Sequence, residues 1–145
     1  MSERHYPERP WVGIGCVVMR GDNVLLVRRA RPPLQGSWTI PGGAQSLGET
    51  MEEAARRELR EEAGIEVGPL TLAVVVDVID RDEAGSIRFQ YSIVDFCACW
   101  LSGEPVAGDD ASEARFFSPA EAEELELWAE TRRAIAVARQ LLSGH

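Results

Sequence analysis

Cysteine and histidine are scarce in this chain, which has three cysteines and two histidines among its 145 residues. Two of the cysteines, Cys97 and Cys99, lie two residues apart in an apolar run, which is the spacing of one face of a strand. The histidines, His5 and His145, are far from both of them in the sequence. A zinc site needs more such ligands close together. The pattern therefore argues against zinc and predicts plain buried thiols in a reducing cytosol.

Long apolar runs and positive charge are also lacking. No run is long enough to span a bilayer, and the first ten residues, MSERHYPERP, are too charged for a secretory signal. We therefore expect a cytoplasmic protein that does not bind a membrane. The 15 basic and 24 acidic residues give a net charge of −9. This charge argues against binding polymeric nucleic acid, which needs a basic surface, but a small anionic ligand stays possible because metal ions and a few arginines can override it locally.

The chain shows no repeat and no linker, and 45% of its residues are hydrophobic. We expect a single domain over residues 1–145 with a genuine core. Strands with helices before and after them predict an α/β fold in which a mixed sheet lies between helices. Loops are expected at 30–37 and 102–113, and Pro41-Gly42-Gly43 is expected to form a tight loop. Asp95 interrupts an apolar strand face, which predicts a bulge or a buried partner. The expected strands are 12–19 and 24–28, joined by a hairpin turn at 21–23, then 38–40, 70–79, 87–101 and 114–117, and the expected helices are 51–63, one that starts at Ser118-Pro119, and 130–142.

The helix at 51–63 carries the most informative pattern. Thr50 and Glu53 form a capping box at its start, and Gly64 stands where a left-handed residue ends a helix. At about 100° per residue, three glutamates share one arc with the small or apolar residues of the helix. These residues are Glu58, Glu61 and Glu62, together with Met51, Ala54 and Ala55.

A solvated face with pairs four residues apart is the common explanation of a charged helix, and Glu52–Arg56 and Glu53–Arg57 have that spacing. It does not explain three acids on the apolar side, which point towards the body of the protein. Three carboxylates one turn apart raise one another's pKa unless a cation lies between them. A hard divalent cation prefers such oxygen ligands, so the pattern predicts a metal site at the three glutamates.

The segment GAQSLGETMEEAARRELREEAGI, from Gly43 to Ile65, resembles the signature of the Nudix hydrolases at every defined position. The resemblance covers nearly the whole chain and implies a Nudix-type α/β/α sandwich with a mixed central sheet. It implies hydrolysis of the pyrophosphate linkage in a nucleoside diphosphate joined to another group, X. Water attacks one phosphorus in that reaction, which depends on Mg²⁺, with Mn²⁺ as a substitute. The positions that carry the resemblance are Gly43, Glu49, Arg57-Glu58-Leu59, Glu61-Glu62 and Gly64-Ile65.

The resemblance also assigns roles to residues. Glu58, Glu61 and Glu62 would bind the metal with the Gly43 carbonyl. Arg57 would orient these acids, with Glu49 as its partner or as an extra carboxylate near the metal. A carboxylate of the loop after the long strand would complete the metal site or act as a base. Asp110 is our choice for it, with Asp109 and Glu113 as alternatives, and the general base stays open between this loop and a glutamate of the signature.

Substrate contacts are less specific in the sequence. Arg28 and Arg29 end a strand, where they are either solvated or clamp a phosphate, for which a guanidinium is well shaped. Trp38 and Tyr91 are candidates to stack on a base, although aromatic residues are more often part of the core. Trp11 and Phe89 share that ambiguity.

Our prediction of X rests on the sequences of two loops. ARPPLQGSW and GDDASEARFF are similar to loops of Nudix proteins described as ADP-ribose pyrophosphatases, so ADP-ribose-like substrates are our first prediction. Clean-up of nucleoside triphosphates, including deoxynucleotides, is the main alternative, followed by NDP-sugars and dinucleotides. An alternative of another class is a nucleotide sensor without activity, but the signature here retains every acid. The resemblance also makes a homodimer possible.

Overall fold

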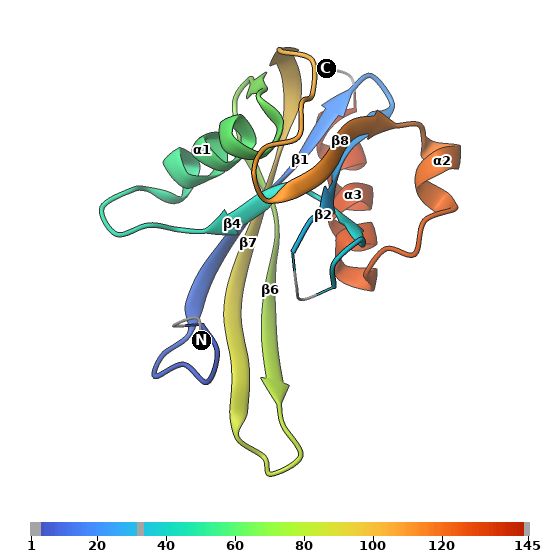
Figure 1. Cartoon of the computed structure of the whole chain (residues 1–145). Coiled ribbons are helices and arrows are strands. Elements are labelled where there is room, and N and C mark those ends of the chain that lie inside the picture. The colour runs from blue at the N-terminus through green and yellow to red at the C-terminus, as the bar shows by residue number, and fades with distance from the viewer. Residues whose placement is uncertain (1–3, 32–33, 144–145) are drawn as a thin grey trace.

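A mixed sheet organises the chain in the computed structural model, which describes residues 4–31 and 34–143 (Figure 1). Within this part of the chain the sheet has eight strands. Five follow the order β3-β2-β1-β7-β5, while β4 pairs with β1, β6 with β7 and β8 with β2. The strands are β1 (Trp11–Arg20), β2 (Asn23–Arg29), β3 (Trp38–Thr39), β4 (Gly42–Ala44), β5 (Glu66–Val67), β6 (Thr71–Arg81), β7 (Ile87–Ser102) and β8 (Ala111–Phe117).

The centre of the sheet is the parallel pair of β1 and β7, which runs from Trp11 opposite Tyr91 to Met19 opposite Cys99. The other pairs are antiparallel. The hairpin between β1 and β2 turns at Gly21, whose φ of 62° suits a residue without a side chain. Beyond the helices, β6 and β7 continue as a long hairpin away from the body (Figure 1).

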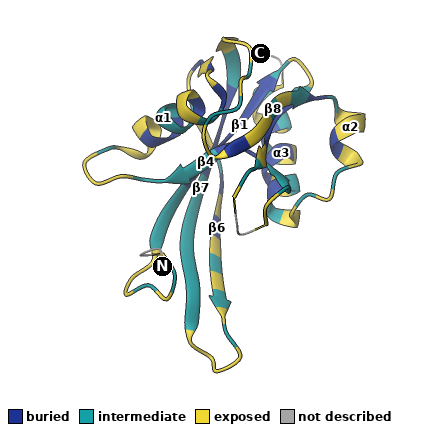
Figure 2. Cartoon of the chain, viewed as in Figure 1, coloured by how far each residue is buried: buried dark blue, intermediate teal, exposed yellow. Residues whose placement is uncertain are grey.

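Helices cover both faces of the sheet and so form two cores. The side chains of β1 alternate between these cores, because successive residues of a strand point to opposite faces. Cys16 and Val18 face the core of α1 (Met51–Ala63), whereas Val17 and Met19 face the core of α2 (Pro119–Glu123) and α3 (Ala129–Leu142). Figure 2 shows buried residues concentrated where the sheet meets α1 and α3. This arrangement confirms the predicted α/β/α sandwich. Within the described residues, no helix is both long and apolar enough to cross a membrane.

Two predicted loops are partly wrong. β8 begins at Ala111 rather than Ala114, because main-chain pairing with Arg29 and Arg28 extends the strand through polar residues. Gly42 and Gly43, predicted as a tight loop, belong to β4 and pair with β1. The predicted loop at 30–37 contains Pro32 and Pro33, which lie outside the described residues.

Asp95 is buried, with only 7% of its surface exposed, on the face of β7 that α3 covers. The predicted bulge is present, because the register of β6 shifts between Leu72 and Val74, opposite this residue. A side chain on Gly15 would collide with the Asp95 carboxylate, so glycine leaves the room it needs. Burial raises the pKa of Asp95 to about 6.

Candidate active site

Helix α1 places two glutamates beside its buried face. Its ends agree with the prediction, since Thr50 and Glu53 form both bonds of the capping box and Gly64 ends the helix in the left-handed conformation. Ala54, Ala55, Leu59 and Ala63 are buried against the sheet, and Glu58 and Glu62 flank them, each half-buried. Met51 was predicted on this face but is 43% exposed, because it lies in the first turn of the helix, ahead of the buried residues.

The glycine backbone of β4 holds these two acids. The Gly42 N–H donates a hydrogen bond to Glu62 Oε2 over 3.0 Å. A methyl group added to Gly43 would lie 2.5 Å from Glu58 Oε1, so the carboxylate of Glu58 rests directly against this glycine. Burial raises the pKa of Glu58, and it raises the pKa of Glu62 to about 7, with a further contribution from the charges of Glu58 and Asp110. The pair therefore favours a cation that would neutralise it.

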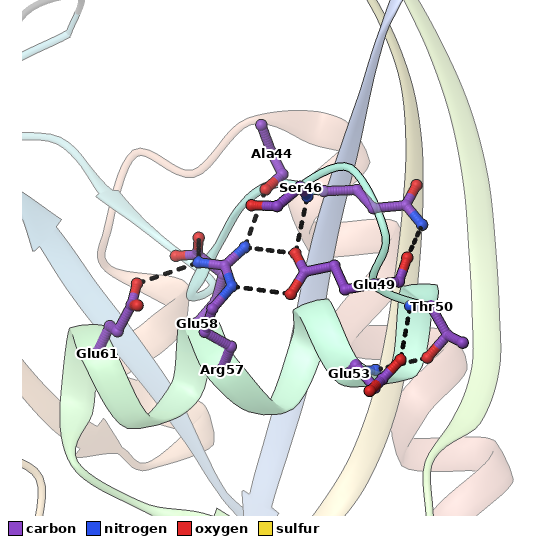
Figure 3. A network of polar contacts seen from close by, with 9 residues as sticks. Ala44, Ser46, Glu49, Thr50, Glu53, Arg57, Glu58 and Glu61 are labelled. Atoms are coloured by element: carbon purple, nitrogen blue, oxygen red, sulfur yellow. Dashed lines mark hydrogen bonds and ion pairs between the residues drawn. The ribbon is translucent and has the colours of Figure 1, made fainter.

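Arg57 connects the acids to the loop before the helix (Figure 3). Its Nε and Nη2 donate to the two carboxylate oxygens of Glu49 over 3.0 and 2.7 Å. Nη1 donates to Glu58 Oε1 over 2.8 Å, and Nη2 also reaches the Ala44 carbonyl. The two hydrogen bonds from Arg57 to Glu49 lower the pKa of Glu49 to about 2. The predicted partnership of Arg57 and Glu49 is therefore present as a bidentate ion pair.

Glu61 does not join Glu58 and Glu62, and the prediction that it points towards the body is wrong. Its side chain is 60% exposed, and it accepts a hydrogen bond from Arg57 Nη1 over 3.1 Å. Glu61 lies at the edge of the helical arc, where an arginine one turn earlier draws it outwards. As a result, no three His, Cys, Asp or Glu side chains in the described residues form a ready-made metal cluster.

Two further charged residues of α1, Arg56 and Glu53, also have partners other than those that the spacing indicated. Arg56 donates to the carbonyls of Val67 and Gly68 and thereby ties the helix to β5. Glu53 takes part in the capping box. Arg56 and Arg57 therefore tie the helix to neighbouring segments, whereas Arg60 makes an exposed ion pair with Glu66.

The loop before β8 packs against the end of α1. The N–H groups of Val106 and Gly108 donate to the carbonyls of Ala63 and Glu62. This places Asp110 close enough to the acids for its charge to raise the pKa values of Glu58 and Glu62. The Asp110 side chain is 72% exposed and pairs with Arg31 over 3.1 Å.

Of the other two acids considered in this loop, Asp109 is exposed, while Glu113 lies in β8 and pairs with Arg28 over 3.2 Å. Asp110 is thus the loop carboxylate whose charge acts on both glutamates. The role of Asp110 in the chemistry, ahead of Asp109 and Glu113, stays a prediction.

The two arginines at the end of β2 face different ways. The charge of Arg29 lowers the pKa of Glu62, so Arg29 lies on the side of the acids. Arg28 instead donates from Nε to the Gly36 carbonyl over 2.9 Å, in addition to its ion pair with Glu113. Of the two arginines, Arg29 is therefore the one that lies on the side of the acids.

The two principal aromatic candidates, Trp38 and Tyr91, lie apart from the acids. Trp38 packs edge to face on Phe117 with ring centroids 4.8 Å apart, within the core that α3 covers. Tyr91 is half-buried and lies opposite Trp11 in the parallel pair of β1 and β7. Neither ring contacts the acids, and Trp38 has the packing of a core residue.

Sequence reasoning did not find the role of Gly42 or of the loop at 106–108. Gly42 supplies the hydrogen bond that orients Glu62, and the loop brings Asp110 to the acids. Both contacts join segments that are distant in the sequence. No local signal points to them.

Comparison with known proteins identifies the family. A family model described as NUDIX domain matches residues 9–138, so this chain belongs to the Nudix family. A solved structure, the MutT NUDIX hydrolase from Burkholderia pseudomallei, is 33% identical, with a TM-score of 0.77 over 89% of this chain and 98% of that one. The NUDIX domain of Shewanella oneidensis NrtR complexed with ADP ribose has a TM-score of 0.78 over 94% of this chain and 90% of that one. Its 22% identity shows the fold alone.

Two curated relatives differ in their described substrates. The ADP-ribose pyrophosphatase of Methanocaldococcus jannaschii is 37% identical over 74% of this chain and 62% of its own length. The putative 8-oxo-dGTP diphosphatase 2 of Mycobacterium tuberculosis is 37% identical over 66% of this chain and 65% of its own length. The chain thus spans less than two thirds of either relative.

Proposed function

We propose that this protein is a pyrophosphohydrolase that uses a divalent metal to cleave nucleoside diphosphate derivatives by attack of water on phosphorus. The observation that carries the proposal is the pair of half-buried glutamates, Glu58 and Glu62, which lie over the Gly42-Gly43 backbone. Both have raised pKa values. Burying two like charges side by side is costly unless a cation neutralises them, and membership of the Nudix family supports the same conclusion.

The donor atoms available here fit Mg²⁺ or Mn²⁺. Glu58 and Glu62 offer carboxylate oxygens, and the Gly43 carbonyl adds a neutral one, which are the hard ligands these ions prefer. Glu61 can reach the site only by leaving Arg57, so we assign it an outer position. A bound divalent ion would polarise the phosphate oxygens and increase the acidity of the attacking water.

The other residues position the acids and handle the proton. Arg57 and Glu49 hold Glu58 in place, which is the function of a partner that orients a metal ligand. Arg29 stands on the side of Glu62 with a guanidinium suited to a phosphate. Asp110 and Glu62 are the two carboxylates placed to accept the proton of water. Water attacks directly, because among the described residues of the site no Ser or Cys is activated as a nucleophile.

ADP-ribose and related compounds are the substrates we propose first. The similarity to the Methanocaldococcus jannaschii ADP-ribose pyrophosphatase supports this choice. The second candidate, a (d)NTP pyrophosphohydrolase, is supported by equal identity to the putative 8-oxo-dGTP diphosphatase 2. A nucleotide sensor without activity would bind the same compounds and leave them intact.

Product analysis with the purified protein tests the proposal. The protein is incubated with Mg²⁺ and ADP-ribose, the dNTPs, 8-oxo-dGTP, NADH, a dinucleoside polyphosphate or an NDP-sugar. We expect metal-dependent hydrolysis, fastest for ADP-ribose, with AMP and ribose 5-phosphate as products. Faster hydrolysis of 8-oxo-dGTP would favour the second candidate, and binding of a nucleotide without hydrolysis of any compound would favour the sensor.

We also propose that the protein works in the cytosol and as a homodimer. The free thiols of Cys16, Cys97 and Cys99 support a reducing compartment, and Cys97 is fully buried as predicted, whereas Cys99 is half-buried. Light scattering at several protein concentrations measures the oligomeric state, and a constant monomer mass would contradict the dimer.

A further inference from the structure

A hollow of about 800 Å³ adjoins the acids on the side of Glu58. It lies between the segment before β1, the loop after β4 and the first turns of α1. Its volume is in the range that holds a nucleoside-sized group. The residues that matter for its chemistry are Arg4, Arg9, Trp11, Ser46, Glu49 and Glu58.

The hollow continues the row of acids rather than forming a separate site. Along β4 and the following loop, Gly42 contacts Glu62, Gly43 contacts Glu58, and Ser46 donates its N–H to Glu49. At roughly 3.3 Å per extended residue, this path reaches on the order of 13 Å from the first contact to the last. Arg29 stands at the Glu62 end and the hollow opens at the Glu58 end. A diphosphate lying across the two acids would therefore extend one of its substituents into the hollow.

The charge of this wall is opposite to that of the whole chain. Arg4 and Arg9 line the hollow in a protein whose net charge is −9. The negative charge of Glu49 is already neutralised by its bidentate pair with Arg57. Guanidinium groups bind phosphate through paired hydrogen bonds. The wall is therefore suited to an anionic group.

Trp11 adds a second, independent observation. Its indole Nε1 is buried and has no hydrogen-bond partner in the described part of the chain. A buried donor without an acceptor is rare in native proteins and calls for an explanation. The Arg9 guanidinium stacks over the same ring, 4.6 Å from its centroid. Trp11 helps to line the hollow, so a hydroxyl or phosphate oxygen that reached Nε1 from there would satisfy this donor beside the stacked cation.

We propose that this N-terminal pocket binds a phosphorylated pentose, namely the substituent that extends from the diphosphate on the Glu58 side. The inference rests on the proposed function. In that reaction the oxygen of water bonds to one phosphorus, the bond from that phosphorus to the bridging oxygen breaks, and the bridging oxygen leaves with the other phosphoryl group. Water also releases its protons, to the leaving phosphate or to solvent. With ADP-ribose, the first substrate that we propose, each half departs as a phosphomonoester of a pentose, so the pocket holds the phosphorylated pentose of one product.

Calorimetric titration in Mg²⁺ buffer tests the pocket directly. The probes are ribose 5-phosphate and AMP, and the variant is Arg9→Glu. The matched control is Arg60→Glu, at an exposed arginine of α1 that lies away from the hollow. We expect Arg9→Glu to weaken one of the two probes at least tenfold, which identifies the half that the pocket holds, and Arg60→Glu to change both less than twofold. Unchanged affinity of both probes in Arg9→Glu would overturn the proposal.

A second variant, Trp11→Phe, keeps an aromatic ring and removes the indole donor. We expect it to weaken the same probe and to remove the change in tryptophan fluorescence that the probe causes in the unaltered protein. An unaltered fluorescence response would contradict the pocket. These outcomes separate the pocket from the proposed function. If the unaltered protein hydrolyses the substrate and Arg9→Glu binds both probes normally, only the pocket is wrong. If Arg9→Glu loses binding of a probe but the unaltered protein hydrolyses nothing, only the proposed function is wrong.

Discussion

Arg57 makes more contacts with the acids than any other described residue, and its geometry explains why this position is an arginine. Its hydrogen bonds are accepted by four carbonyl or carboxylate groups. Two of these bonds go to one carboxylate, that of Glu49. A planar guanidinium can make these bonds at once, whereas an ammonium group cannot. The side chain of Glu58 is therefore fixed before any ligand arrives.

Replacing Arg57 by Lys keeps the charge and loses this geometry. We expect kcat to fall by about 10- to 100-fold, the usual cost of removing a partner of a metal ligand, and the Mg²⁺ concentration for half-maximal rate to rise. Steady-state kinetics across a Mg²⁺ titration measures both. Arg60→Lys is the control, because Arg60 makes one exposed ion pair, and a rate for Arg57→Lys equal to that control would remove Arg57 from the site.

The half-buried carboxyl group of Glu62 makes the stability of the metal-free protein depend on pH. Its folded-state pKa is raised from 4.5 to about 7, so the folded chain binds more protons than the unfolded chain between these values. The free energy of unfolding therefore falls as the pH rises through this window. At about 1.4 kcal/mol for each pKa unit, the contribution of Glu62 to this fall is on the order of 3 to 4 kcal/mol.

Glu62→Gln should remove the contribution of Glu62 to that fall. Urea unfolding in EDTA at pH 4.5 and pH 8 measures it, with Glu52→Gln as the control because Glu52 is exposed in the first turn of the same helix. We expect Glu62→Gln to be more stable than the unaltered protein at pH 8 and similar to it at pH 4.5. Equal stability of the two at pH 8 would show that the Glu62 carboxylate is not destabilised by burial.

The loop acids provide a matched pair of neighbours. The charge of Asp110 acts on both Glu58 and Glu62, so Asp110→Asn should reduce turnover more than Asp109→Asn does. As a general base or metal partner, Asp110 should contribute about 10²-fold or more. Turnover rates over a range of pH measure the effect, and equal, small losses in both variants would exclude this loop from the chemistry.

At the level of elements, the site is built from one helix and one strand, and only the helix is visible in the sequence. The limits of α1 follow from local signals, Thr50 with Glu53 at its start and Gly64 at its end, so they were predictable. Strand β4 depends on pairing with β1, whose residues are about thirty positions earlier. The outward turn of Glu61 depends on competition for Arg57. Such contacts between segments have no local pattern, and they decide which of the predicted acids come together.

The two glycines of β4 have separable roles. A methyl group at Gly43 would lie 2.5 Å from the end of the flexible Glu58 side chain, whereas at Gly42 it would collide with the Ile14 main chain. Gly43→Ala should therefore reduce kcat with a small change in melting temperature, and Gly42→Ala should lower the melting temperature as well. Thermal unfolding and kinetics of both variants measure this, and full activity in Gly43→Ala would contradict the contact with Glu58.

At the level of the whole molecule, the parallel pair of β1 and β7 divides the chain into two cores, each covered by helices. The α1 core supports the acids, and the α3 core contains Cys97, while β7 contributes buried residues to both cores. This division was predictable from alternating apolar strands and from the Nudix resemblance. The hollow at the N-terminal segment was not, because it forms between three segments whose proximity only the fold creates.

The central claim is that the Glu58–Glu62 pair binds the divalent ion that hydrolysis requires. The most direct measurement compares ADP-ribose hydrolysis by the unaltered protein, Glu62→Gln and Glu52→Gln, each with Mg²⁺ and with EDTA. We predict a loss of about 10²-fold or more in Glu62→Gln, an unchanged rate in Glu52→Gln, and no hydrolysis by any of the three in EDTA. Hydrolysis by Glu62→Gln at the unaltered rate, with circular dichroism confirming that all three are folded, would contradict the claim.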